Sequence, residues 1–147
     1  MVIYGSRRKR SSSSGVQVDP ACIEAFQSLK LGKKFKYVIY KLSADNTRIE
    51  VEKQAETGSY DDFVAELPKE DCRWAVYDFD FKTKDGERNK IIFYAWSPDG
   101  ARIKPKMLYS SSKEALRRSL NGIAAEIQGT DLDEVAYDTV FDKINRV

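Results

Sequence analysis

The stretch KPKMLYSSSKEALRRSLN, residues 104–121, has the pattern of an amphipathic helix. At about 100° per residue, one side collects basic and polar side chains and the opposite side collects apolar and small ones. The first set is Lys106, Ser110, Lys113 and Arg117, and the second is Leu108, Ser112, Ala115, Leu116 and Ser119. Pro105 suits the first helical turn, and Gly122 suits a left-handed cap after the last turn. The spacing therefore predicts a helix with one solvated basic face and one packed face.

Upstream of this helix, the sequence alternates between helix and strand patterns. Asp19 and Pro20 form the start signal of a helix that ends near Gly32. The stretches 35–42 and 48–53 alternate on either side of an Asp-Asn turn, which predicts a β-hairpin.

A second pair of strand-like stretches is rich in aromatic residues. Residues 72–81 and 90–96 are joined across a turn marked by Asp85 and Gly86. We expect them at the centre of the sheet. Trp74 and Trp96 are then core residues rather than a surface for stacking nucleic-acid bases.

Acidic side chains in this part of the chain have structural explanations. Ser59 and Asp62 have the spacing of a capping box, which predicts a short helix that ends before Pro68. Asp78 and Asp80 have strand spacing, so they share one face of a strand. No metal-binding loop pattern surrounds them, and we expect them to pair with nearby Lys or Arg side chains.

Composition limits the classes of protein that the chain can represent. The chain has 147 residues, of which 41% are hydrophobic, which suits one domain with its own core. The net charge of +2 indicates no nucleic-acid partner. Its two cysteines are far apart in sequence, which favours free thiols inside the cell. No apolar run is long enough to span a membrane.

Catalytic chemistry has little support in the sequence. The chain contains no histidine, so it lacks the usual general base and the common Ser/His and Cys/His pairs. It also contains no Walker, GxGxxG or GxSxG motif. We therefore expect no enzyme, no cofactor and no metal site.

The first residues differ in character from the rest of the chain. MVIYGSRRKRSSSSG combines a basic cluster with a serine run and shows no hydrophobic periodicity. We expect residues 1–14 to be a disordered extension and residues 15–147 to form the folded domain. The RRKR cluster is compatible with a nuclear import signal or with contact to anionic lipids.

Several long blocks resemble one family in the same order along the chain. They are YDDFVAELPKEDCRWAVYDFDF at 60–81, RNKIIFYAWSPD at 88–99, KMLYSSSKEALRRSLNG at 106–122 and QGTD at 128–131. Together they resemble the actin-depolymerising factor/cofilin family. The resemblance implies a single α/β (α+β) domain of the ADF-homology type, with a mixed central β-sheet flanked by helices on both faces. It also implies a break after Gly122, a loop through Gly129, a last strand at 134–136 and a closing helix at 137–145.

The resemblance implies two sets of binding residues. The set for monomeric and filamentous actin is Ser14, Gly15, Val16, Lys104, Lys106, Met107, Lys113, Glu114, Arg117 and Arg118. The set for filaments alone is Arg88, Lys90, Asp142, Lys143 and Arg146. Ser14 matches the serine at which the family is phosphorylated, and a phosphate there adds negative charge against an acidic partner.

The implied activity is the severing and depolymerisation of actin filaments without chemical catalysis. The family prefers ADP-bound subunits and stabilises a twisted filament state. By the same resemblance we expect a monomer in the cytoplasm, on the actin cytoskeleton, with a nuclear pool as a further expectation. An alternative is a regulator whose main ligand is phosphatidylinositol bisphosphate, bound by Lys106, Lys113 and Arg117. A small enzyme is the third and weakest alternative.

Overall fold

The computed structural model describes residues 15–145, which form one mixed six-stranded sheet in the order β2-β4-β3-β5-β6-β7. The four inner strands are antiparallel: β3 (Tyr37–Leu42), β4 (Arg48–Ala55), β5 (Arg73–Thr83) and β6 (Gly86–Trp96). The two edge strands pair in parallel with their neighbours: β2 (Gln17–Val18) with β4, and β7 (Ala125–Gly129) with β6.

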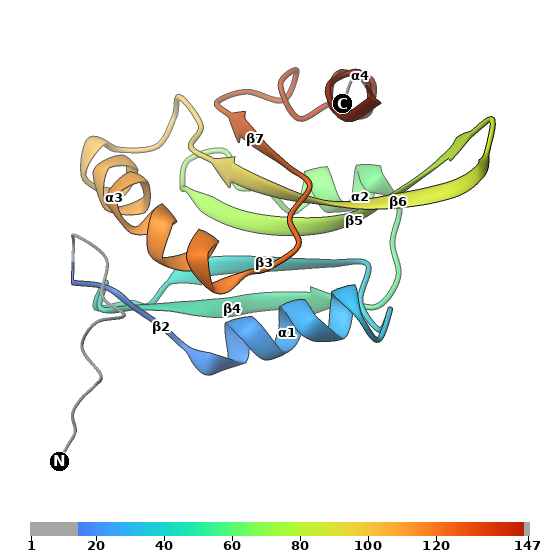
Figure 1. Cartoon of the computed structure of the whole chain (residues 1–147). Coiled ribbons are helices and arrows are strands. Elements are labelled where there is room, and N and C mark those ends of the chain that lie inside the picture. The colour runs from blue at the N-terminus through green and yellow to red at the C-terminus, as the bar shows by residue number, and fades with distance from the viewer. Residues whose placement is uncertain (1–14, 146–147) are drawn as a thin grey trace, which may run out of the picture.

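Helices cover both faces of this sheet, as the sequence predicts (Figure 1). On one face lie α1 (Pro20–Lys30) and α3 (Ile103–Ser119), and on the other lie α2 (Tyr60–Ala65) and α4 (Tyr137–Asn145). Alternate residues of β5 serve the two cores: Trp74 and Val76 pack on the α1/α3 side, whereas Ala75 and Tyr77 pack on the α2/α4 side. Because both faces are buried, β5 has a nearly continuous apolar sequence.

Local capping chemistry fixes the starts of the first two helices. The Asp19 side chain accepts a hydrogen bond from the Ala21 amide at 2.9 Å, and Pro20 follows in the first turn. Ser59 and Asp62 form the predicted capping box, in which each side chain accepts a hydrogen bond from the backbone amide of the other residue. These bonds satisfy amides that a helix start otherwise leaves without partners.

The predicted ion pairs of the acidic strand residues are confirmed. Asp78 is buried and lies 3.2 Å from the Lys33 ammonium, and its other oxygen accepts a hydrogen bond from the Asn89 side chain. Asp80 pairs with Lys36 at 2.9 Å. Within residues 15–145, no group of three or more His, Cys, Asp or Glu side chains is arranged to hold a metal ion. No helix in that range is long and apolar enough to cross a membrane.

The segment after α3 differs from the prediction. The helix ends at Leu120 in an extended conformation, and Gly122, with φ +103°, lies in the turn beyond it rather than at the helix cap. The predicted loop up to Gly129 is wrong, because Ala125–Gly129 forms β7. The predicted strand at 134–136 is also wrong, since these residues form a turn before α4. Five residues are too few for their pattern to predict a strand. In the folded chain they pair with β6 and satisfy the backbone hydrogen-bonding groups at its open edge.

Gly129 is required where β7 passes β6. A Cβ atom at this position would lie 2.7 Å from Val135 Cγ1 and 3.0 Å from Trp96 Cε3. Both neighbours are almost fully buried, so they have little room to move.

Replacement of Gly129 by alanine should therefore destabilise the fold. We expect Gly129→Ala to lower the free energy of unfolding by about 1–3 kcal/mol through overpacking, measured by urea denaturation. The control is Gln128→Ala, because Gln128 is exposed on the same strand and such changes usually stay within about 0.5 kcal/mol. Equal stability of the two variants would contradict this explanation.

Candidate functional site

Tyr109 anchors α3 to the sheet through a ring contact and a hydrogen bond. Its ring lies 4.4 Å from that of Trp74, centre to centre, and its hydroxyl accepts a hydrogen bond from the Leu42 amide at 2.9 Å. Ser112, Ala115 and Leu116 complete the buried side of the helix. The opposite side of α3 is thereby turned to solvent in one defined orientation.

The prediction that the basic face of this helix is solvated is wrong for two of its residues. The Lys113 ammonium donates to Glu126 Oε2 at 2.6 Å, and the Arg117 guanidinium donates to Glu126 Oε1 at 3.0 Å. Only 26% of the Lys113 side chain and 31% of the Arg117 side chain are exposed. Because Glu126 lies on β7, these residues tie α3 to the edge strand. The helical spacing shows which residues share a side, but not that β7 covers that side.

The charge state of this cluster follows from its hydrogen bonds. Burial on its own raises the pKa of the Glu126 carboxyl, but the hydrogen bonds from Lys113 and Arg117 outweigh burial and lower its pKa below the ordinary value. The carboxylate is therefore ionised near neutral pH, and it forms a three-residue ion cluster with the two cations. Arg117 also lies over the ring of Phe93, 5.6 Å from its centre.

The most exposed side of α3 is a different set of residues, spaced three or four apart. We call it the outer stripe, and it consists of Lys104, Met107, Ser111, Glu114 and Arg118. Met107 is 65% exposed, and Ile103, one turn earlier on the helix, is 76% exposed. Four of the stripe's five residues belong to the predicted set. The sequence did not single out Ile103, because an apolar residue at a helix start usually packs in the core.

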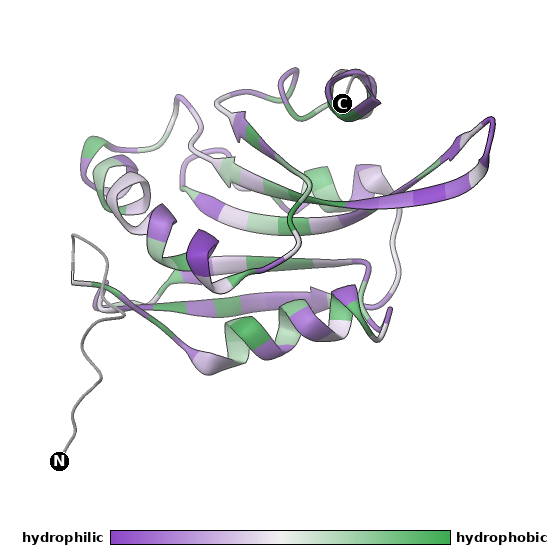
Figure 2. Ribbon diagram, in the orientation of Figure 1, coloured by the Kyte–Doolittle hydropathy of each residue, from purple (hydrophilic) through white to green (hydrophobic). Residues whose placement is uncertain are grey.

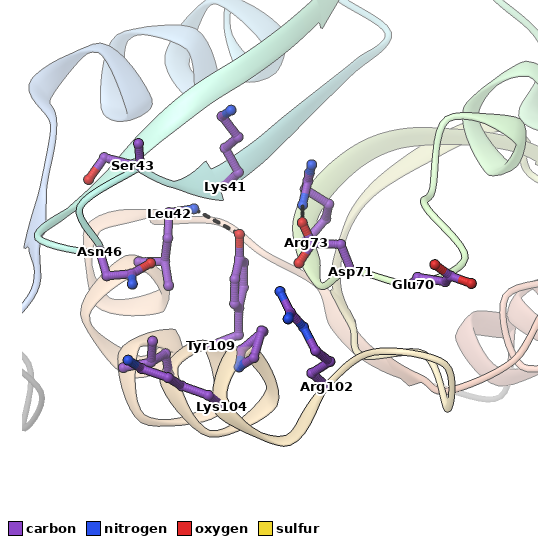
Figure 3. Close-up of a pocket in the computed structure, with 13 residues that line it drawn as sticks. Lys41, Leu42, Ser43, Asn46, Glu70, Asp71, Arg73, Arg102, Lys104 and Tyr109 are labelled. Carbon is purple, nitrogen blue, oxygen red and sulfur yellow. Dashed lines mark hydrogen bonds and ion pairs between the residues drawn. The ribbon is translucent and has the colours of Figure 1, made fainter.

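The start of α3 also borders a pocket of about 580 Å³ that the sequence did not predict (Figure 3). Four cationic side chains line it, together with two acidic ones: Lys41, Arg73, Arg102, Lys104, Glu70 and Asp71. Arg73 is held by Glu52 at 2.8 Å and by Asp71 at 2.9 Å. Residues from separate segments meet here, so no local motif marks the pocket. Lys106 lies elsewhere, beside Lys113 at a smaller cavity between α3 and the strand ends.

At the N-terminal end of the domain, the structure describes two of three predicted neighbours and places their side chains differently. Gly15 is exposed and has φ +80°, whereas Val16 is 2% exposed and packs in the α1/α3 core. The Val16 side chain therefore cannot contact a partner in this conformation, contrary to the expectation. Ser14 lies outside the described residues, 15–145. The strand β2 lies next to α3, so the structure does bring the chain at Gly15 close to that helix.

The second predicted set lies at the other end of the sheet. Arg88 is 59% exposed near the tip of the β5–β6 hairpin, 3.9 Å from Asp85. Figure 2 shows this end of the hairpin as mainly hydrophilic. Phe93, which lies beneath α3, follows Gly86 by seven positions along the extended strand β6, a distance of roughly 23 Å. Asp142 and Lys143 are exposed on α4, and Arg146 lies outside the described range.

Lys90 has a structural role that its sequence position does not reveal. Its ammonium donates to the Ile144 carbonyl at 3.0 Å, near the end of α4, and lies 5.8 Å from the centre of the Phe81 ring. The side chain thus joins β6 to α4. This link brings Arg88, Asp142 and Lys143 into one region around the hairpin and α4.

The fold agrees with that of a known family. Residues 15–145 match the model of the cofilin/tropomyosin-type actin-binding proteins. The chain belongs to this family. Cofilin of Mycosarcoma maydis is 58% identical over 135 residues, which cover 91% of this chain and 97% of that protein. Cofilin of Schizosaccharomyces pombe is 55% identical over 92% of this chain and 98% of that protein.

Solved structures support the same conclusion for the fold. The crystal structure of Streptomyces griseoflavus cofilin superposes with a TM-score of 0.86 at 54% identity, over 90% of this chain and 98% of that one. The predicted family and the predicted mixed sheet with helices on both faces are both confirmed.

The ion cluster around Glu126 should stabilise the domain in a pH-dependent way. A carboxyl whose pKa is lowered by folding contributes stability above its unfolded pKa, about 4.3 for Glu, and loses that contribution as pH falls through its folded pKa. We expect Glu126→Gln to lower the free energy of unfolding by about 1 kcal/mol at pH 7. The difference should shrink towards pH 3.5.

Denaturant unfolding of both proteins at the two pH values measures this. Glu114→Gln is the matched control, because Glu114 is exposed on the same helix and forms no ion pair with any residue in 15–145. A difference for Glu126→Gln that stays constant with pH would show that the ion cluster does not stabilise the fold.

Proposed function

We propose that this protein binds monomeric and filamentous actin, and severs and depolymerises filaments without catalysing a chemical reaction. The single observation that carries the proposal is the outer stripe of α3. It combines the exposed apolar Met107 with charged neighbours on a helix whose other side is locked to the sheet. A rigid apolar centre with a charged rim is the usual anatomy of a protein–protein contact. Membership of an actin-binding family names the partner.

The contact with monomer and filament is assigned first to the outer stripe. Lys104, Glu114 and Arg118 are exposed and can pair with charged groups of actin without losing a partner in this domain. Lys106, Lys113 and Arg117 stay in the proposed surface through their exposed edges. The ion pairs of Lys113 and Arg117 with Glu126 give these two side chains a second role, which is to hold α3 in position. Gly15, and Ser14 before it, extend this surface.

The contact with filaments alone is assigned to the hairpin tip and α4. Arg88, Asp142 and Lys143 are exposed there, and Lys90 links the hairpin to α4. Arg146, the residue after α4, belongs to the same assignment. This surface lies at the far end of β6 from α3, so a second actin subunit can reach it. Simultaneous contact with two subunits lets the protein favour the twisted, ADP-bound filament state over the relaxed state, and a shift in that equilibrium weakens the filament.

Phosphatidylinositol bisphosphate is the second candidate ligand, and the pocket at the start of α3 favours it. Lys41, Arg102 and Lys104 line this pocket and form no ion pair with another residue in 15–145. The proposed lipid site therefore differs from the one expected from the sequence. Lys113 and Arg117 are excluded because their charged groups already pair with Glu126. Lys104 is shared with the outer stripe, so lipid and actin would compete.

Regulation and location follow from the same assignment. A phosphate on Ser14 would add charge of about −1.5 to −2 beside the proposed actin surface and weaken binding. The protein would act as a monomer on the actin cytoskeleton in the cytoplasm. The RRKR cluster would support an additional nuclear pool.

Truncation of the outer stripe tests the proposed function. Met107→Ala combined with Arg118→Ala should weaken binding to both monomers and filaments by at least about tenfold, because removal of a central apolar contact and a charge costs roughly 2 kcal/mol or more. Filament co-sedimentation and titration of labelled monomers measure the two affinities. Gln27→Ala is the control, because Gln27 is exposed on α1 and lies outside both proposed surfaces. Unchanged affinities in the double variant would refute the surface.

Arg88 separates the two proposed surfaces. Arg88→Ala should weaken filament binding and slow severing, watched by microscopy of labelled filaments, while monomer affinity stays unchanged. The reason is that Arg88 lies five residues of extended strand, roughly 17 Å, before Phe93 beneath α3. Lys69→Ala is the matched control, because Lys69 is an exposed cation after α2 and lies outside both proposed surfaces. Arg88 is preferred to Lys90, whose removal would also release the Ile144 carbonyl. Equal losses for monomer and filament would show that Arg88 belongs to no separate site.

A further inference from the structure

A groove of about 550 Å³ lies outside both proposed actin surfaces. It is bounded by the end of α2, the loop after β6 and the loop after β7. Leu132 is 56% exposed at its edge, whereas Trp96 at its floor is almost fully buried. Ligand-binding clefts usually have volumes of about 300–1,000 Å³, so this groove has room for a few side chains of a partner. Its apolar lining consists of Val64, Ala65, Leu67, Trp96, Pro98 and Leu132.

Hydrogen bonds hold the walls of this groove in place. The Trp96 indole N–H donates to the Pro68 carbonyl at 2.7 Å, which ties β6 to the segment after α2. The Thr130 amide and hydroxyl both donate to the Glu134 carboxylate, at 2.7 and 2.8 Å, which closes the loop after β7 on itself. The groove is therefore preformed, and no loop has to be ordered when an occupant binds.

The rim of the groove is acidic. Asp99, Asp131 and Asp133 line it, together with one cation, Lys69. The carboxylates of Asp99 and Asp133 form no hydrogen bond or ion pair with another residue in 15–145. Each of them can therefore pair with a cation of a partner without losing an interaction within this domain.

The apolar floor and the acidic rim together decide which occupant fits. Three carboxylates against one ammonium repel nucleic acids, phosphorylated groups and anionic lipids. A purely basic segment would leave the apolar floor uncovered, and a purely apolar one would leave the carboxylates beside it without partners. A segment that carries large apolar side chains next to Lys or Arg satisfies both.

We propose that this groove binds a short segment of a partner protein in which large apolar side chains are flanked by Lys or Arg. The apolar side chains lie against Leu67, Trp96 and Leu132, and the cations lie beside Asp99 and Asp133. No residue of the groove belongs to either proposed actin surface. An occupied groove therefore leaves both surfaces accessible, and the protein can hold this partner and actin at the same time.

The expected affinity for an isolated segment is low. A short peptide in a groove of this size buries less area than a standard protein–protein interface, so we expect a dissociation constant on the order of 0.1 mM. The charge pairs lie at the exposed rim, where salt screens them. An increase from about 0.05 M to about 0.5 M salt should therefore weaken binding roughly threefold or more.

Titration of the isotope-labelled full-length protein with synthetic peptides, followed by NMR, tests the proposal. Each probe peptide carries two leucines between pairs of lysines, with the leucines adjacent or separated by one or two alanines. We expect at least one probe to shift the Trp96 indole signal and the backbone amides of Leu132 and Asp133. Peptides with serine in place of leucine, or glutamate in place of lysine, should shift none of these signals. Absence of shifts with every probe at about 1 mM, or shifts confined to other parts of the chain, overturns the proposal.

Groove variants locate the binding site. Leu132→Ser should weaken binding of the probe about fivefold or more by removing an apolar contact. Asp99→Asn combined with Asp133→Asn should weaken it by a similar factor and reduce its salt dependence. Glu24→Gln is the control, because Glu24 is an exposed carboxylate on α1, and it should bind the probe as the native protein does. Native affinity in either groove variant overturns the proposal.

A dilution series of the protein without peptide tests a different occupant, which is a second copy of this chain. The groove signals should stay constant with protein concentration. If they move with concentration as they do with the probe, a second copy fills the groove, and the proposed partner chemistry is overturned. No sample contains actin, so the result is independent of the proposed function.

Discussion

The structure depends on one constraint, which is that the central strands are buried on both faces. Strands β3, β5 and β6 carry apolar side chains alternately into two separate cores, so each face needs its own pair of covering helices. This requirement places α3 and α4 on opposite sides of the same sheet. The two proposed partner surfaces therefore lie on different elements because of how the core is built, and no second domain is needed to supply them.

The orientation of α3 follows from two kinds of contact that act at different points along the helix. Tyr109 fixes the first half against Trp74 and the Leu42 amide, and the ion cluster of Lys113 and Arg117 with Glu126 fixes the second half against β7. Neither contact alone would set both the tilt and the rotation of the helix. Half-buried basic residues thus work as structural links, and the freely exposed charges of the outer stripe are left to meet a partner.

Local chemistry and periodicity predicted those parts of the fold that depend on neighbours in sequence. The caps at Asp19 and Ser59 and the hairpin turn at Gly86 are of this kind. The failures depend on neighbours in space. The strand β7 exists because β6 has an open edge, and the basic side of α3 is partly covered because β7 lies there. Likewise, nothing near Val16 in the sequence shows that its side chain packs in the α1/α3 core. Ion pairs of Asp78 and Asp80 were predictable only as a class, and the identity of their partners, Lys33 and Lys36, required the folded chain.

Strand β6 connects the two proposed actin surfaces as one rigid element. Phe93 pairs with Glu126 of β7 and lies against the Arg117 guanidinium, and three residues earlier Lys90 holds the Ile144 carbonyl of α4. The spacing between the surfaces is then fixed by the strand, because densely packed cores on both faces resist bending. A binder of fixed spacing cannot adapt to every arrangement of two neighbouring actin subunits. It binds best the arrangement that matches its own spacing, and its binding energy stabilises that arrangement at the expense of others. On this reasoning the filament changes shape and the protein does not, which is how a protein without a catalytic group would weaken a polymer.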